Sequence, residues 1–411
     1  MGLADIYALD LSIVPVLADM EETGVRVDKG RLLAVQEMLA QQLVGIEQWL
    51  WREYKWAGNL RSTKDKQQLL FDVGGLRPGR KTQTGFSTDK EVLSGLDSEL
   101  AAKVLLWNEL DVLRSNFVEK LPKMVLADGR IHANFNQAGG HEDSGDDRNS
   151  PSTGRLSSSN PNLQNIPVRT ELGKLVRAAF LPQPEWVFIK TDVAQEEVRL
   201  LALLAGCKRL IEQFEAGRDP YIPMTAQLFP GVDITKDRRF TAKTVFLAKQ
   251  YGAGAAKVWE ICGKLKMPIT RAHAGRVNDW FDTQYPEISL YVDKCWQKVL
   301  ELGYVESYFG RRRWLPAAIV GDRRQREAAK RMAVNMPVQG TGADVMKMVL
   351  VKVYGELPPP ARLVLTVHDE WVVETPINLV RDVWTICSRA TKGLLPIPLP
   401  VEVGQPAECW E

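Results

Sequence analysis

The sequence predicts an α+β protein in which strands far apart in the chain form one sheet. Two apolar, β-branched runs, Leu363–Val367 and Trp371–Val373, flank the triplet His368-Asp369-Glu370, a pattern typical of two strands joined by a tight turn. Another apolar run, Trp186–Lys190, lies far upstream and leads to an acidic residue. Residues 198–350, between these strands, show mostly helical spacing. We therefore expect a sheet domain that a long helical segment interrupts.

The N-terminal third of the chain has the pattern of a helical module. Residues 1–58 carry apolar side chains at spacings of three and four. The pair Ser62–Asp65 approximates a capping box that begins a further helix, and Gly74-Gly75 ends it. Residues 87–91 give another helix start, and residues 99–122 continue as helix. We expect this third to be all-helical.

The pattern changes after this module. Residues 139–152 are rich in Gly, Ser, Asp and Asn and lack apolar periodicity, which predicts an exposed loop. A short strand is expected at Ala179–Leu181, before the longer strand that begins at Trp186.

The composition excludes several classes of protein. The chain has 411 residues, of which 45% are hydrophobic and 25% are charged, as in an ordinary globular protein. No apolar run approaches the roughly 20 residues of a membrane span, and the N-terminus lacks the features of a signal peptide. The five cysteines are scattered without CxxC spacing, so neither a disulfide framework nor a zinc site is predicted. We expect a cytoplasmic protein that does not contact a membrane.

The net charge of +2 conceals a strong segregation of charge. Residues 236–271 contain nine Lys or Arg against two acidic residues, and residues 311–331 contain eight against two. Basic blocks in a nearly neutral chain indicate a surface that faces a polyanion. A solvated helix face is the alternative for either block alone.

Two acidic residues at strand ends indicate a metal site. Asp369 lies in the expected turn, and Asp192 ends the upstream strand. Divalent Mg²⁺ prefers oxygen ligands and keeps open positions for substrate phosphates. Taken alone, the triplet at 368–370 is more often a solvated turn, but the second strand end favours the metal site.

A second candidate site lies on one helix face. Arg239, Lys243, Leu247 and Tyr251 are spaced by four, so they share one slowly drifting face of a helix. A cationic pair followed by an aromatic residue suits a row of phosphates followed by a base. Without the other motifs, a solvated stripe is the preferred interpretation of the cationic pair.

Five segments together carry a family resemblance. They are TGRLSSSNPNLQNIPVR at 153–169, DVAQEEVR at 192–199, the helix pattern at 239–252, NMPVQGT at 335–341 and VHDE at 367–370. In this order they resemble the polymerase region of family A DNA polymerases, the bacterial DNA polymerase I type. The similarity runs from about Leu11 to Cys409.

The resemblance implies a right-hand polymerase fold with an antiparallel-sheet palm, helical fingers and a helical thumb. It divides the chain into an N-terminal segment that packs on the palm (1–28), the thumb (29–125), the first part of the palm (126–197), the fingers (198–331) and the second part of the palm (332–411).

The resemblance also assigns the residues that carry the chemistry. Asp192 and Asp369 match the family's metal ligands, which hold two Mg²⁺ ions, for which Mn²⁺ is an expected substitute. Glu370 has a supporting role, and Lys243 is expected to protonate the departing pyrophosphate.

Further residues match nucleotide and DNA contacts of the family. The expected nucleotide-binding set is Arg239, Lys243, Leu247, Tyr251, Glu197, Gln195 and His368, with Glu197 opposed to a ribose 2′-hydroxyl. The expected DNA-binding set is Arg155, Asn162, Gln164, Asn165, Arg169, Arg331, Asn335 and Gln339. Arg155 and Gln339 match residues that touch the minor groove, whose acceptors vary little between correct base pairs. Arg311–Arg313 and the helix start at 62–66 are expected phosphate contacts, with a plain surface role as an even alternative.

Several positions depart from the family pattern. Leu247 stands where the family usually has Phe or Tyr, and this feature and YGAG at 251–254 resemble phage members. Val193 and Glu196 replace the commoner Tyr and Ile. We expect slower or more selective synthesis than in a Leu247→Phe variant.

The predicted function is template-directed DNA synthesis from dNTPs on a primer–template, by a monomer acting in replication or repair in a bacterial or phage-infected cell. Because the resemblance begins almost at Met1, we expect no N-terminal 3′–5′ exonuclease domain in this chain: either the natural protein lacks proofreading, or the chain is a fragment of a longer one. One alternative is an enzyme similar to single-subunit RNA polymerases, against which Glu197 argues. The other is a non-catalytic DNA-binding protein of the same fold.

Overall fold

The computed structural model describes residues 2–82, 85–137, 153–168 and 170–411. The loop expected at 139–152 and Arg169 therefore lie outside the described residues. The chain divides into two compact units. The first comprises Met1–Gly24, Ala133–Gln164 and Gln183–Glu408, and the second comprises Val25–His132, Asn165–Pro182 and Cys409–Glu411. Both contain helices and antiparallel strands, so the predicted α+β class is confirmed.

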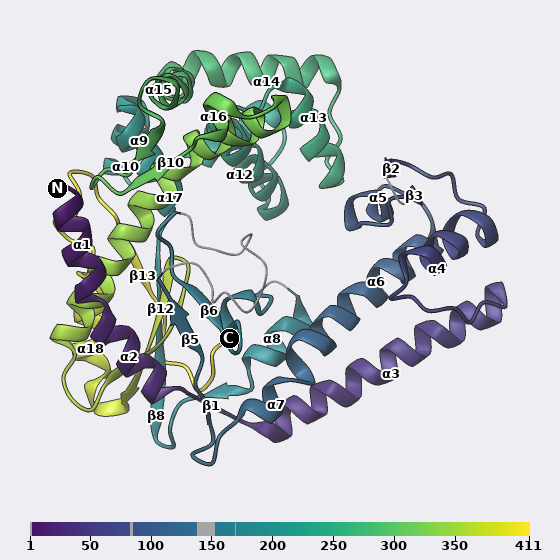
Figure 1. Cartoon of the computed structure of the whole chain (residues 1–411), viewed down its shortest axis with the longest axis horizontal. Helices are drawn as coiled ribbons and strands as arrows, with labels where there is room; N and C mark the ends of the chain where they lie inside the picture. The colour runs from purple at the N-terminus through teal and green to yellow at the C-terminus, as the bar shows by residue number, and fades with distance from the viewer. Residues whose placement is uncertain (1, 83–84, 138–152, 169) are drawn as a thin grey trace. The chain divides into compact units, whose positions relative to one another are not determined.

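The second unit is built on the long helix α3 (Lys29–Tyr54). The Asp28 side chain accepts a hydrogen bond of 3.0 Å from the backbone N–H of Arg31 and so caps the helix. The buried face of α3 packs against α6 (Glu99–Leu113), and the two helices lie side by side in Figure 1. This face presents Leu32, Val35, Leu39, Leu43, Ile46 and Leu50.

The predicted helix starts in this unit are present. Ser62 caps α4 (Thr63–Gln67) by accepting from the N–H of Asp65, and the π-helical turn η1 (Gln68–Val73) ends at Gly74. Asp89 caps α5 (Lys90–Ser94). The other helices and strands are η2 (Arg114–Val118), α7 (Leu121–Met124), α8 (Glu171–Arg177), β2 (Lys81–Thr82) and β3 (Gly85–Phe86).

The expectation of an all-helical N-terminal third is wrong. The strand β1 (Val25–Val27) pairs antiparallel with β4 (Arg130–Ile131) and β7 (Phe180–Leu181). A strand of three residues is too short to display an alternating pattern, and its partners come from distant parts of the chain. The preceding helices α1 (Leu3–Ser12) and α2 (Val14–Thr23) belong to the first unit.

The first unit contains a sheet in the strand order β11-β12-β8-β13. The inner strand β8 (Trp186–Val193) pairs antiparallel with β12 (Glu370–Pro376) on one side and with β13 (Val401–Val403) on the other. The edge strand β11 (Arg362–Val367) forms a hairpin with β12, as the sequence predicts. A separate pair, β5 (Asn134–Asn136) and β6 (Ser157–Ser159), also belongs to this unit.

Helices flank this sheet. The helix α18 (Val380–Ser388) packs on β8 and β12, and α2 packs on β11. The longest helix, α17 (Arg323–Glu356), contacts α1, α2, α9 (Glu196–Ala205) and α18, and Figure 1 shows it running alongside α1. A short 3₁₀ turn, η6 (Ile377–Leu379), precedes α18, and another, η5 (Leu163–Asn165), follows β6 in the chain.

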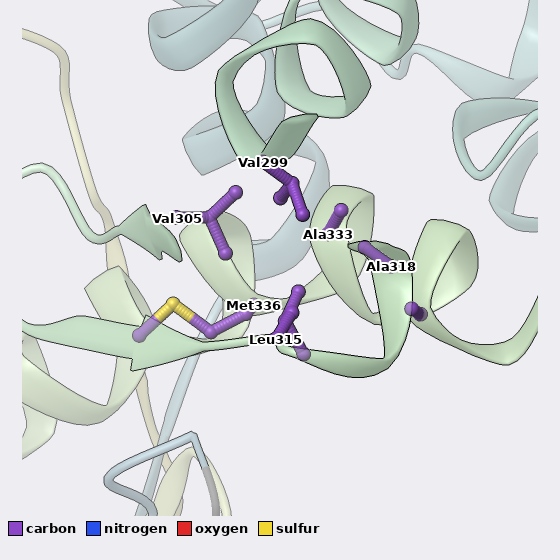
Figure 2. Close-up of a cluster of buried hydrophobic side chains, with 7 residues drawn as sticks. Val299, Val305, Leu315, Ala318, Ala333 and Met336 are labelled. Atoms are coloured by element: carbon purple, nitrogen blue, oxygen red, sulfur yellow. The ribbon is translucent and has the colours of Figure 1, made fainter. Parts of the chain in front are cut away.

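The rest of the first unit is mostly helical, as expected for residues 198–350. Its elements are α10 (Lys208–Glu215), α11 (Tyr221–Leu228), α12 (Lys236–Gln250), α13 (Ala255–Lys264), α14 (Arg271–Gln284), α15 (Pro286–Leu302), the hairpin β9 (Tyr304–Glu306) with β10 (Arg312–Trp314), and α16 (Ala317–Val320). Figure 2 shows an apolar cluster that joins α15, the hairpin, α16 and α17. Val299, Val305, Leu315 and Met336 are buried in it.

Two further features concern membrane spans and cysteines. In the described part of the chain, no helix is both long enough and apolar enough to span a bilayer. All five cysteines are free thiols.

Candidate active site

Asp192 and Asp369 lie next to each other at one end of the sheet. Val367 of β11 pairs with Glu370 of β12, so His368 and Asp369 form the turn between these strands. The backbone N–H of Val193 donates a hydrogen bond of 3.2 Å to the carbonyl oxygen of Asp369. The two aspartates, 177 residues apart in the sequence, are thereby brought together by strand pairing.

A third strand adds another carboxylate. Asp192 pairs with Glu370 on β12 and with Glu402 on β13. Residues directly opposite in antiparallel strands project from the same face, with Cβ atoms roughly 5 Å apart. Glu402 was missed by the sequence analysis. Its strand has only three residues, and nothing in that segment shows which strand it pairs with.

These carboxylates repel one another. Burial, and then the charges of Asp369, Glu370 and Glu402, raise the pKa of Asp192 from 3.8 to about 7. A carboxyl group that resists ionisation in this way is stabilised by any cation placed beside it. The arrangement therefore favours binding of positive charge.

The chain turns sharply between Asp192 and α9. Gln195 occupies the left-handed region with φ 54°, as does His368 in the facing turn with φ 58°. Non-glycine residues adopt this conformation at a cost of roughly 1–2 kcal/mol, and such residues are concentrated at functional sites. The turn at Gln195 places Glu196 and Glu197 in the first turn of α9.

Glu197 is joined to the end of α12. The hydroxyl group of Tyr251 donates a short hydrogen bond to a carboxylate oxygen of Glu197. Burial and the neighbouring Glu197 charge raise the pKa of Tyr251 well above 10, so the phenol remains a hydrogen-bond donor at any physiological pH. The predicted nucleotide-binding residues 197 and 251 are thus in direct contact.

The cationic face of α12 is held by residues that the sequence analysis did not single out. The Arg239 Nε atom donates a hydrogen bond of 2.5 Å to Asp219, and its guanidinium carbon lies 5.4 Å from the ring centre of Tyr221. The Lys243 Nζ atom lies 5.9 Å from the same ring. Tyr221 is buried at the start of α11, which packs against α12. Leu247 is half-buried one turn after Lys243.

A pocket of about 20 Å³ gathers several of the predicted contacts of DNA and nucleotide. Arg155, Gln164 and His368 line it together with Glu196. A side-chain N–H of Gln164 donates a hydrogen bond of 3.1 Å to the carbonyl oxygen of Thr366. Four segments that are distant in the sequence therefore meet at this pocket, the fourth being α17 with Gly342, Ala343 and Met346. Glu196 is the member that the sequence analysis recorded only as a departure from the family pattern.

The other predicted DNA contacts are more scattered. Arg331, Asn335 and Gln339 lie along α17 at a spacing of four, with Arg331 exposed. The side-chain carbonyl oxygen of Asn335 is buried and has no hydrogen-bond partner among the described residues, so it can accept a bond from a ligand. Asn162 and Asn165 are exposed, in the first and second units respectively.

Arg311 does not have the exposed position expected of a phosphate contact. Its guanidinium group makes two hydrogen bonds to Asp10, of 2.7 and 2.9 Å, and one of 2.7 Å to the buried Asp344. The Lys347 ammonium group also donates a hydrogen bond of 2.6 Å to the Asp10 carboxylate. This cluster joins α1, α17 and the loop before β10, and it was not found from the sequence because Asp10 lies about 300 residues from its partners.

The side chains at 192 and 369 fit a divalent cation, because both are hard oxygen ligands whose mutual repulsion a cation relieves. Among the residues that the structure describes, no group of three or more His, Cys, Asp or Glu is placed to hold a metal ion. An incomplete protein ligand set is what Mg²⁺ uses when substrate oxygens complete its coordination.

Comparisons with known proteins agree with this geometry. Residues 29–411 match the model of DNA polymerase family A. The chain is 37% identical to the thermostable DNA polymerase I of Thermus aquaticus over 94% of its own length and 46% of the relative. It is 35% identical to DNA polymerase I of Chloroflexus aurantiacus over 97% of its length and 42% of the relative.

A solved structure is also similar. The POL domain of Pol1 from M. smegmatis, in complex with DNA primer-template and dNTP, superposes with a TM-score of 0.87 and 29% identity. The match covers 98% of this chain and 70% of that one. The chain spans about half the length of the curated relatives that it matches.

Proposed function

Because the chain belongs to DNA polymerase family A, we propose that it is a DNA-directed DNA polymerase that adds dNTPs to the 3′-hydroxyl of a primer. The observation that carries this proposal is the position of Asp369 beside Asp192, which follows from the pairing of Asp192 with Glu370 and from the hydrogen bond between the Val193 N–H and the Asp369 carbonyl oxygen. A structural neighbour that holds primer–template DNA and dNTP supports the same substrates here. The predicted right-hand division, with thumb, palm and fingers, is part of the proposal.

Family A polymerases use divalent metal ions, and we propose two Mg²⁺ ions, replaceable by Mn²⁺, at Asp192 and Asp369. When bound, such ions activate the primer hydroxyl and neutralise charge on the triphosphate and the leaving pyrophosphate. Glu370 and Glu402 share the face of the sheet with Asp192 and add negative charge that favours cations there. The raised pKa of Asp192 supports this assignment, since it reflects burial and repulsion from neighbouring carboxylates that a cation would relieve.

The face of α12 suits the triphosphate. Asp219 fixes the Arg239 guanidinium through Nε, which leaves its terminal nitrogens for phosphate oxygens. Lys243, one turn on, supplies a second cation and is the proposed donor of a proton to pyrophosphate. Tyr251, which follows the two cations along this face, donates a hydrogen bond to Glu197, and Glu197 would oppose a ribose 2′-hydroxyl. Gln195, His368 and Leu247 remain proposed nucleotide contacts.

The DNA would be held without reading its sequence. Arg155, Gln164, Gln339 and Asn335 are donors and acceptors suited to the minor groove of the primer–template. Arg331, Asn162, Asn165 and Arg169 complete the proposed DNA-binding set. A monomer in the cytoplasm, acting in replication or repair, is consistent with the family.

Extension of a labelled, primed template with dNTPs and Mg²⁺ tests the function. We expect full extension by the unaltered chain and none by Asp192→Ala, while both bind the primer–template. Extension by Asp192→Ala would refute the metal assignment. Extension with rNTPs alone would favour the RNA polymerase alternative, and DNA binding without extension by the unaltered chain would favour a non-catalytic protein. A mismatched primer in the same assay tests for proofreading.

A further inference from the structure

Glu196 is a buried acid whose position the proposed mechanism does not explain. Its side chain lies in the first turn of α9 and is 7% exposed. One carboxyl oxygen, Oε1, is buried without a hydrogen-bond partner among the described residues. A buried polar atom of this kind is costly unless a ligand or an ordered water satisfies it.

The chain makes room for this carboxyl group. Gly342 of α17 faces it, and a Cβ atom at position 342 would stand 3.0 Å from Oε2 and 3.2 Å from both Oε1 and Cδ of Glu196. Such contacts are tighter than packed side chains normally make, so a larger residue at 342 would displace the carboxyl group. Gly342 therefore permits the position that Glu196 occupies.

The pocket beside Glu196 has the size and the lining for one water molecule. Its volume is about 20 Å³, and a polar cavity needs roughly 10–15 Å³ to hold a water. Arg155, Gln164 and His368 line it together with Glu196. A water there would bond to the free oxygen of Glu196 and to a polar group of the proposed DNA-contacting residues.

We infer that Glu196 is a positioning residue: its carboxyl group, admitted by Gly342, holds Arg155 and His368 in place through one water molecule. The inference rests on the proposed function, because Arg155 and His368 are taken as contacts of the primer–template and nucleotide. It goes beyond that function by giving a role to an acid at a position where the family commonly has Ile.

The electrostatics of the pocket agree with this role. Burial, and then the charge of Asp369, raise the pKa of Glu196 from 4.5 to about 8, with smaller contributions from Glu197 and Asp192, while Arg155 lowers it. At neutral pH the carboxyl group is therefore mostly protonated, so it can both donate and accept a hydrogen bond. A neutral carboxyl group can orient a water without drawing the Arg155 guanidinium into a buried ion pair.

Two substitutions separate the polar role from the shape. Glu196→Gln keeps the shape and the hydrogen-bonding atoms, and Glu196→Leu keeps the approximate volume and removes them. Circular dichroism and the unfolding temperature confirm that each variant folds. The main measurement is the dissociation constant of a fluorescent primer–template in EDTA without dNTP, so that catalysis is not needed.

We expect Glu196→Leu to weaken binding about five- to tenfold, the effect of losing one hydrogen-bonded contact. Glu196→Gln should bind within about twofold of the unaltered chain. In an Arg155→Ala background, Glu196→Leu should add less than about a further twofold loss, because its effect acts through Arg155. Gly342→Ala should weaken binding by a similar factor, because the added Cβ atom displaces the Glu196 carboxyl group. In the double variant, the losses in affinity from Gly342→Ala and Glu196→Leu should not add.

Equal dissociation constants for Glu196→Leu and the unaltered chain would overturn the inference. It would also be overturned if Glu196→Leu weakened binding by the same factor in the Arg155→Ala background as in the unaltered chain. An unaltered chain that binds no primer–template overturns the proposed function instead. In that case, a high-resolution crystal structure of the chain still tests the role of Glu196 separately from the proposed function. A water bonded to Glu196 Oε1 and to Arg155 or His368 supports it, and a direct contact or an apolar gap there overturns it.

Discussion

Replacing Asp192 by Asn should make the metal-free protein more stable while it abolishes synthesis. The folded chain holds the pKa of Asp192 at about 7, against 3.8 ordinarily, so the folded state binds a proton more tightly than the unfolded state. The corresponding contribution to stability is complete below about pH 3.8 and is lost as the pH rises to 7. Above pH 7 the ionised carboxylate therefore destabilises the fold.

The size of the effect follows from the same values. At 1.36 kcal/mol per pKa unit, the difference between 3.8 and about 7 corresponds to at most about 4 kcal/mol. Water reaches the partly exposed carboxylate and screens the repulsion, so about 2 kcal/mol is the expected gain for Asp192→Asn at pH 8. The gain should shrink as the pH falls from 7 towards 4.

Thermal unfolding in EDTA between pH 5 and 8.5 measures this gain. We expect the unfolding temperature of Asp192→Asn to exceed that of the unaltered chain by roughly 2–4 °C at pH 8. Added Mg²⁺ should stabilise the unaltered chain by binding the native state and should stabilise the variant less. Asp97→Asn, at an exposed carboxylate in a loop, is the matched control and should show neither effect. A variant less stable than the unaltered chain in EDTA at pH 8, or a gain that does not vary with pH, would refute the reasoning.

Three further substitutions test other parts of the structure. Leu247→Phe should speed single-turnover incorporation or increase the use of dideoxynucleotides; equal rates and equal use would contradict this expectation. Asp219→Asn should raise the KM for dNTP about three- to tenfold with little change in the affinity for DNA, because Arg239 loses a charged hydrogen bond, and an unchanged KM would count against the role of that contact. Asp10→Ala should lower the free energy of unfolding by about 3 kcal/mol in denaturant titrations, because the partly buried Arg311 loses two hydrogen bonds; a loss below about 1 kcal/mol would show that the ion pair is not structural.

The sequence predicted local structure well where the signal is local. The hairpin around His368 to Glu370 was predicted because apolar β-branched runs on both sides of a polar triplet need no distant partner to be recognised. The helix caps at Ser62 and Asp89 were predictable for the same reason. β1 was missed because its three residues acquire strand structure only by pairing with β4 and β7.

For the candidate site, the sequence supplied the residue types and the fold supplied their neighbours. The acidic character of Asp192 and Asp369, and the spacing of Arg239 and Lys243, could be read from the chain and from its family resemblance. Glu402 could not be assigned, because only the pairing of β13 with β8 places it opposite Asp192.

The sequence alone therefore determined the fold class, the family and the side chains capable of metal and phosphate binding, since these depend on residue identity and short-range spacing. Only the tertiary structure determined that the two aspartates meet, that Asp219 holds Arg239 and that Gly342 admits the Glu196 carboxyl group. Contacts between residues separated by tens to hundreds of positions arise from strand pairing and helix packing. Neither strand pairing nor helix packing produces a periodic pattern in a single sequence from which the partner could be identified.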